Sequence, residues 1–141
     1  MKDKTDLVRG WLRKAESDIK ALEASLSVEA FDAACFHAQQ SVEKHLKAYL
    51  LHHGAEFPFT HNLAKLLEIC AGLDQAFRTL LPLVEPLTPY AVELRYDAEF
   101  WPGLAAVEEA RAAAKVVRDF VVQRLPNRAG RGPDIGPPTT S

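Results

Sequence analysis

The sequence lacks most of the features that mark secreted, membrane-spanning or metal-stabilised proteins. Its two cysteines, Cys35 and Cys70, form no CxxC pair, which argues against a zinc knuckle or a thioredoxin-type redox site. No apolar run approaches the roughly 18 residues of a membrane span, and the start, MKDKTDLVRGWLRKAESD, contains no apolar run of a secretory signal. We therefore expect a cytoplasmic protein without a membrane segment, in which both cysteines are buried as small apolar side chains.

A basic excess is also missing. The 141 residues hold 17 Lys and Arg against 19 Asp and Glu, a formal net charge of −2, which excludes the overall basic composition of a protein that coats nucleic acid. Neither GxxxxGK[ST] nor GxGxxG occurs, so the common phosphate-binding loops are absent. The length suits one compact domain, and 48% hydrophobic residues can form a core without disulfides or a metal.

Apolar residues recur at intervals of three and four, the spacing of amphipathic helices. The pattern predicts a first helix over 6–26, a second from 31 to a stop at Gly54, and a third that Thr60 caps and Gly72 ends. The first two helices form an antiparallel hairpin because their connection is short. The first helix is expected to face the core with a stripe of six residues: Leu7, Trp11, Ala15, Ile19, Leu22 and Leu26.

Shorter segments follow before a long last helix. Asp74 is expected to cap a helix over 75–81, and Thr88-Pro89 to open a short piece, PYAVELR. After Pro102 a helix continues to about residue 121, and its apolar residues exceed a single stripe, which suggests a second buried surface and a homodimer. Because no segment alternates like a strand, we predict an all-α, up-and-down bundle of four to five helices, with short extra helices and no sheet.

The last sixteen residues differ in composition. Residues 126–141, PNRAGRGPDIGPPTTS, hold four Pro and three Gly and almost nothing apolar, so they cannot repay the entropy of ordering. We expect the helical domain to span 1–125 and residues 126–141 to be a disordered Pro/Gly-rich tail.

A polar stripe on the second predicted helix carries the first candidate site. Gln40, Glu43, Lys44 and Lys47 are spaced so that they share one face. Such a stripe is ordinarily a solvated helix face, and Glu43 with Lys47 is a favourable i,i+4 pair. A second segment, Leu94-Arg95-Tyr96-Asp97, precedes the last helix. There Arg95 could pair with Glu43 or hold a phosphate, and Tyr96 could stack on a base.

These residues carry a family resemblance. AFDAACFHAQQSVEKHLKAYLLHHG, then PFTHNLAKLLEIC, then TPYAVELRYD before a terminal helix, resembles the HEPN domain over roughly 6–125. The resemblance implies a helical bundle, frequent homodimers, and pairing with a minimal nucleotidyltransferase in toxin–antitoxin operons. It also implies that many relatives are metal-independent ribonucleases.

The ribonuclease motif of that family is missing. Active members place an Arg four to six residues before a His near the start of the last helix, so that Arg steadies the phosphate and His moves a proton. Here every Arg from Arg78 onward follows all five histidines, and Arg9 and Arg13 lie far upstream of them. We therefore expect no intact ribonuclease site. A divergent ribonuclease remains the alternative, with Arg95 as the phosphate ligand and Glu43 or Asp97 as the acid or base.

Two further features have competing interpretations. His52, His53 and His61 could bind a metal, but helix-end and loop positions favour structural roles, and we expect no metal or cofactor. His61 could donate to a neighbouring loop carbonyl. Trp101, beside Phe100, is expected to be a hydrophobic plug at the bundle end or part of a dimer surface.

Three hypotheses remain. The first is a nucleotide-binding and interaction module without catalytic turnover, whose ligand residues are Gln40, Glu43, Lys44, Lys47, Arg95 and Tyr96. Its partners would be a nucleotidyltransferase, a second copy of the chain, and a nucleotide or RNA. The second is the divergent ribonuclease. The third is a purely structural role, in which Glu43 and Arg95 tie the second helix to the segment before the last one.

Overall fold

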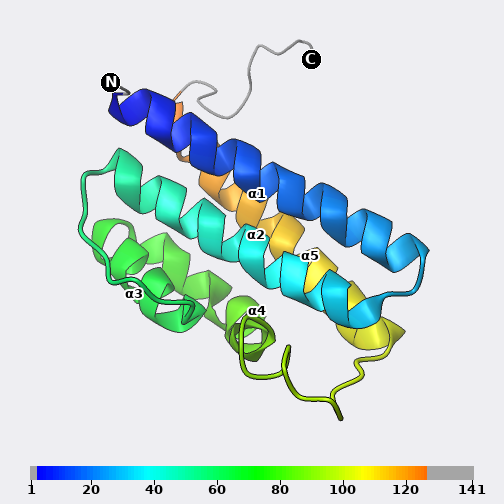
Figure 1. Ribbon diagram of the computed structural model, residues 1–141. Helices are drawn as coiled ribbons and strands as arrows, with labels where there is room; N and C mark the ends of the chain where they lie inside the picture. Colours follow the sequence, from blue (N-terminus) through cyan, green and yellow to red (C-terminus); the bar gives the residue numbers. More distant parts are fainter. Residues whose placement is uncertain (1–2, 127–141) are drawn as a thin grey trace.

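The computed structural model describes residues 3–126, and it shows a helical bundle (Figure 1). In chain order the elements are α1 (Lys4–Ser27), α2 (Phe31–His52), α3 (Leu63–Leu73), the 3₁₀ helix η1 (Gln75–Leu80), α4 (Leu81–Val84), the 3₁₀ helix η2 (Glu85–Tyr90) and α5 (Leu104–Gln123). Within the described range there is no strand, so the predicted all-α fold is confirmed. Of the predicted tail, residues 126–141, all except Pro126 lie outside the described residues.

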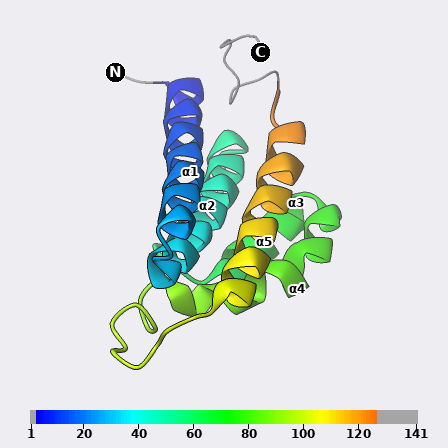
Figure 2. The same cartoon turned by 90° about the vertical axis from the view of Figure 1, so that its right-hand side faces the viewer.

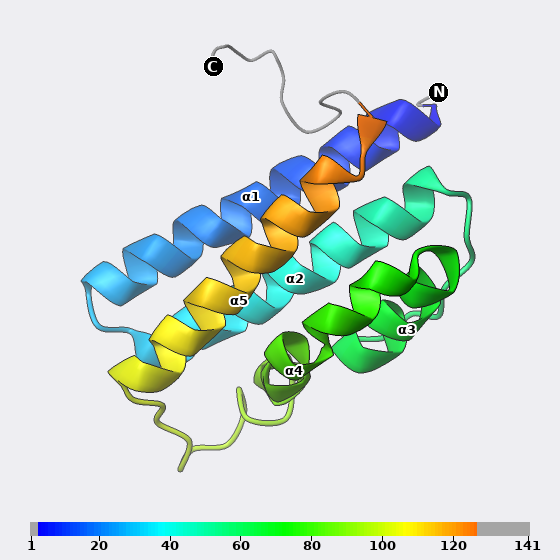
Figure 3. The same ribbon diagram turned by 180° about the vertical axis from the view of Figure 1, so that it is seen from behind.

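Helix α2 is the centre of the bundle. It lies antiparallel to α1, which follows it along its whole length (Figure 1), and α5 runs along another side of it (Figure 3). The segment from α3 to η2 packs against α2 as well and lies away from α1 (Figure 2). Because neighbours surround α2 on several sides, more than half of its residues are buried, including Gln39, Ser41 and His45. None of the described helices is both long and apolar enough to cross a membrane.

The core face of α1 is rotated from the predicted one. Val8 and Leu12 are buried, whereas Leu7 is 43% exposed and Trp11 is only partly covered. The stripe continues through Ala15, Ile19 and Leu22 as predicted. The sequence pattern alone could not decide whether Leu7 and Trp11 or Val8 and Leu12 face the core, because both pairs are apolar and lie side by side on the helix.

Two predicted helix starts are wrong. Asn62, not Thr60, caps α3, because Asn62 Oδ1 accepts from the Lys65 amide at 3.1 Å, while Thr60 Oγ1 accepts from the Asn62 amide. Thr88 lies inside η2 and opens no helix; its hydroxyl oxygen accepts instead from the amide of Leu63. Asp74 does cap the following helix through the Ala76 amide, but that helix is the 3₁₀ helix η1.

Most apolar side chains of helix α5 are buried within the chain itself. Of the residues that suggested a second buried surface, Val116 is exposed and Phe120 is half-buried, and the others are buried in the bundle core. Cys35 and Cys70 are buried as predicted, and burial raises the pKa of their thiols to about 11 and about 12. Trp101 is 75% exposed, so the prediction of a plug at the bundle end is wrong.

Candidate functional site

The polar stripe of α2 is not a solvated helix face. Glu43 and Lys47 are each only 4% exposed, although they occupy the same face as the half-buried Phe36 and Gln40. This face lies between α1 and the loop that leads to α3, and side chains from both cover it. The carboxylate and the ammonium therefore meet in a partly dehydrated environment, where an ion pair is stronger than in water and an unpaired charge is costly.

Glu43 is the hub of a hydrogen-bonded cluster. Its Oε2 accepts from Lys47 Nζ at 2.8 Å. Its Oε1 accepts from Gln39 Nε2 at 3.1 Å and lies 2.8 Å from Nδ1 of His61. Burial would raise the pKa of Glu43, but the hydrogen bonds from Lys47, His61 and Gln39 together hold it below its ordinary value. Glu43 is thus held as a carboxylate with both oxygens occupied. We call Gln39, Glu43, Lys47 and His61 the Glu43 cluster.

The loop before α3 is positioned by the same cluster. Gln39 Nε2 also donates to the carbonyl oxygen of His61 at 3.1 Å, and Gln40 Nε2 donates to Gln39 Oε1 at 2.7 Å. His61 is therefore fixed through both its ring and its backbone, while 41% of its side chain stays exposed. Phe59 is 92% exposed and its ring lies 5.7 Å from Lys47 Nζ.

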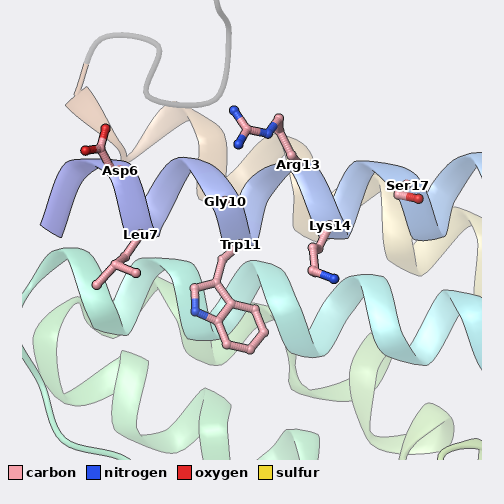
Figure 4. A pocket seen from close by; sticks show the side chains of 7 residues that line it. All are labelled: Asp6, Leu7, Gly10, Trp11, Arg13, Lys14 and Ser17. Atoms are coloured by element: carbon pink, nitrogen blue, oxygen red, sulfur yellow. The ribbon is translucent and has the colours of Figure 1, made fainter. Parts of the chain in front are cut away.

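Trp11 closes the α1 side of this face. Its ring centroid lies 5.9 Å from Lys47 Nζ, a cation–π distance. Figure 4 shows Leu7 and Trp11 extending from α1 toward α2, whereas Arg13 points the other way. These side chains line an open hollow along α1. The indole thus covers the buried ammonium from outside.

A second cluster lies further along the α1–α2 interface. Asp18 is buried, and its two oxygens meet His37 Nδ1 at 2.8 Å and Lys44 Nζ at 2.5 Å. Sequence analysis assigned Lys44 to the anion site, but its ammonium is neutralised by Asp18. Lys44 therefore ties α2 to α1.

Arg95 does not pair with Glu43, so that prediction is wrong. Its guanidinium carbon lies 4.2 Å from the ring centroid of Phe36 and 5.6 Å from that of Tyr96. Arg95 forms no ion pair with any residue in the described range. Tyr96 beside it is 77% exposed. Its neighbour Asp97 accepts through Oδ1 from the amide of Glu99 at 2.9 Å, which shapes the turn.

The predicted site residues thus fall into three groups instead of one. Glu43 and Lys47 belong to the Glu43 cluster, and Gln40 contacts that cluster through Gln39. Lys44 pairs with Asp18, and Arg95 and Tyr96 form a separate platform on Phe36. Sequence reasoning missed Gln39, Asp18 and the role of His61. The i,i+4 spacing of Gln39 and Glu43 could have indicated the role of Gln39. The contacts of Asp18 with Lys44 and of His61 with Glu43 join residues far apart in sequence and could not be predicted from spacing.

The cluster holds no arrangement that fits a metal ion. No group of three or more His, Cys, Asp or Glu side chains within residues 3–126 lies close enough to bind one. The described residues offer a face of α2 whose charges are neutralised, an imidazole that a carboxylate orients, and, on a separate platform, the exposed guanidinium of Arg95. These groups can bind an anion with an aromatic ring and can orient a proton-transfer group.

Comparison with known proteins places this geometry in a family. Residues 8–125 match the model of the HEPN domain, so the chain belongs to the HEPN family, as its motifs had indicated. It is 23% identical over 133 residues to "Putative toxin MJ1304" of Methanocaldococcus jannaschii, covering 81% of this chain and 88% of that protein. The crystal structure of TT1696 from Thermus thermophilus matches with a TM-score of 0.68 and 26% identity, covering 84% of this chain and 98% of that one.

Proposed function

We propose that this chain is a nucleotide-binding and interaction module, the partner of a minimal nucleotidyltransferase in a toxin–antitoxin pair. Membership of the HEPN family and the similarity to a protein named as a toxin support the second half of this proposal. The Arg95 platform supports the first half and carries the proposal for the ligand.

The Arg95 platform has the chemistry of a small nucleotide site. A guanidinium without a carboxylate partner can hold a phosphate through two parallel hydrogen bonds. Arg95 is such a group within the described residues, and its stacking on Phe36 restricts its orientation. Tyr96 offers an exposed ring for a base. Because Lys44 and Lys47 are already neutralised, Arg95 is the one cation that residues 3–126 leave free at this site, which fits a single nucleotide better than a long polyanion.

Calorimetric titration with ATP, GTP and UTP tests this proposal. We expect wild-type protein to bind at least one of them, and Arg95→Ala to weaken that binding roughly tenfold or more, the effect of losing a charge-assisted bidentate contact. Arg13→Ala is the matched control, because Arg13 is an exposed arginine that points away from α2 (Figure 4). Equal affinity in wild type and Arg95→Ala, or no binding of any nucleotide, contradicts the proposed site.

The nucleotidyltransferase partnership has its own test. If the gene adjacent to this one encodes a minimal nucleotidyltransferase, we expect the two proteins, co-expressed with a tag on one, to elute together in size-exclusion chromatography. Separate elution at micromolar concentration contradicts the partnership while leaving nucleotide binding open.

The divergent metal-independent ribonuclease is the second candidate, and the orientation of His61 favours it. Glu43 is a poor acid or base, because it accepts three hydrogen bonds and its pKa is lowered. It does orient the half-exposed imidazole of His61, as a carboxylate orients a general base. Total RNA incubated without metal should be cleaved by wild type and spared by both Arg95→Ala and His61→Gln. Unchanged RNA with wild-type protein removes this candidate.

A further inference from the structure

The segment of residues 92–103, which lies between η2 and α5, projects from the bundle as an arm (Figures 1 and 2). It contains turns and no regular helix. Two aromatic contacts hold it: Phe100 lies 5.6 Å from Tyr90 between ring centroids, and Arg95 lies over Phe36 of α2. The backbone adds local bonds, among them the amide of Phe100 to the carbonyl of Asp97. The arm is thus fixed at two points and presents its remaining side chains outward.

Exposed apolar surface is concentrated on this arm. Three of the eleven large hydrophobic side chains that are exposed in the described chain lie within these twelve residues, namely Val92, Tyr96 and Trp101, and a fourth, Leu104, opens α5 directly after them. Trp101 is the most informative, because tryptophan is rarely left in water without a reason and is strongly enriched among the residues that dominate protein interfaces. Trp101 does not pack into the core, whereas its neighbour Phe100 packs against Tyr90.

Most charged side chains on the arm and in the first turns of α5 are carboxylates. Glu93, Asp97 and Glu99 are exposed on the arm, and Glu108 and Glu109 are exposed in the first turns of α5. None of these five carboxylates forms an ion pair with a residue of the described chain. The only cation on the arm is Arg95, which is stacked against α2. The segment that carries Trp101 therefore holds three exposed carboxylates without an ion-pair partner in the described chain, and two more follow at the start of α5.

Exposed apolar side chains together with carboxylates indicate which kind of partner can bind the arm. A nucleic acid would bring a row of phosphates against these carboxylates, and Arg95 alone could offset only one or two of them, which is unfavourable; a single nucleotide bound at Arg95 does not meet this obstacle. A second copy docked arm to arm would place like charges together at the interface. An apolar protein surface flanked by lysines or arginines satisfies both the exposed apolar groups and the carboxylates.

We propose that the arm, with Trp101 as its anchor, is the docking element for a basic partner protein whose apolar surface, flanked by lysines or arginines, receives the indole. The proposal rests on the interaction role proposed above and specifies its surface. Trp101 supplies the buried contact, and Glu99 with Glu108 supplies steering and orientation from the edge. Arg95 and Tyr96 keep their separate task at the base of the arm.

The test uses full-length protein and two labelled helical peptides, one with Leu on one face and Lys on the other, and one with Glu in place of Lys. Fluorescence anisotropy should show binding of the Lys peptide only. Trp101→Ala and Glu99→Lys should each weaken it roughly tenfold or more. The matched controls Leu73→Ala and Glu68→Lys change an exposed leucine and an exposed glutamate of α3, and they should leave the affinity within about twofold. Circular dichroism checks that all four variants fold.

Several results overturn the proposal: no binding of the Lys peptide, equal binding of the Glu peptide, or equal losses in the control variants. Light scattering adds another, because a Trp101→Ala variant that converts a dimer into a monomer makes the arm a self-interface. Titration of the same variants with ATP separates this inference from the nucleotide site. Lost nucleotide binding in Arg95→Ala beside a retained peptide affinity shows two independent surfaces.

Discussion

Glu43 shows how one buried carboxylate can organise several elements. It joins two positions of α2 to the loop before α3, and each of its oxygens has a donor. A buried ion pair is poor evidence of net stabilisation, because dehydration of both charges offsets their attraction. Removal of one partner is different, since the other charge then stays buried alone.

We predict that Glu43→Ala lowers the free energy of unfolding by about 3–5 kcal/mol, because it strands Lys47 and the donors of Gln39 and His61. Urea denaturation measures this change. Glu16→Ala is the control, since Glu16 is a half-exposed glutamate of α1 whose ion pair with Arg118 is long, 3.7 Å, and it should change stability by less than about 1 kcal/mol. Similar losses in both variants would contradict the role of the cluster.

His45 predicts a distinct pH dependence. Burial lowers its pKa from 6.5 to about 4, while its Nδ1 lies 2.9 Å from the carbonyl oxygen of Ser41. Because the unfolded chain binds the proton more readily, stability falls as pH drops from about 6.5 to about 4, by at most about 3 kcal/mol. His45→Gln should flatten the stability curve in this window, and His53→Gln, an exposed neighbour, should leave the slope unchanged.

Glu43 acts in the same direction at lower pH. Its pKa is below the ordinary 4.5, so its contribution is present above that pH and is lost as the pH falls further. Glu43→Gln should remove the acid part of the curve and keep the part due to His45. A single transition that neither variant alters would refute both assignments.

At the scale of the element, the loop before α3 contributes both to the N-terminal cap of α3 and to the candidate site. Asn62 caps α3, and the preceding residue, His61, contacts Glu43. We predict that Asn62→Ala destabilises the protein by about 0.5–2 kcal/mol and that Asn62→Asp restores most of it, because aspartate is an equally good cap. Thermal unfolding of the two variants measures this. Equal losses in both would show that the cap is not the source of the effect.

The helices themselves were predictable, because their apolar spacing is regular and proline and glycine interrupt it at the right places. The cap of α3 was not, since Thr60 and Asn62 are both good capping residues and their positions differ by half a turn. That η1 is a 3₁₀ helix could likewise not be predicted from the sequence, because it depends on packing against α3. The sequence places Glu43 and Lys47 on one face of α2, but the burial of that face depends on Trp11 and the 53–62 loop, which only the tertiary structure brings over it.

At the scale of the whole molecule, the near-neutral charge of −2 hides an uneven distribution. The lysines of α2 are neutralised inside the α1–α2 interface and the Glu43 cluster, whereas carboxylates gather around the arm. Arg95, whose guanidinium has no ion-pair partner among the described residues, lies at the base of this arm. The proposed anion site and the proposed docking surface are therefore neighbouring parts of one segment.

We predict a homodimer, for which the HEPN family and the exposed Val116 of α5 are the supporting features. Light scattering at micromolar concentration should return twice the 15.6 kDa mass of the chain. Val116→Asp should shift that value toward the monomer by placing a charge in an apolar contact, while Trp101→Ala should not. A wild-type mass of one chain would refute the dimer.

The location of the nucleotide tests the central claim most directly. In ¹H–¹⁵N spectra of the labelled protein, added ATP should shift the amide signals of Phe36, Gln40, Arg95 and Tyr96. The outer face of α1 around Arg13 should stay unchanged. Shifts that centre on another surface, or a spectrum that ATP does not alter, would contradict the assignment of the Arg95 platform as the nucleotide site.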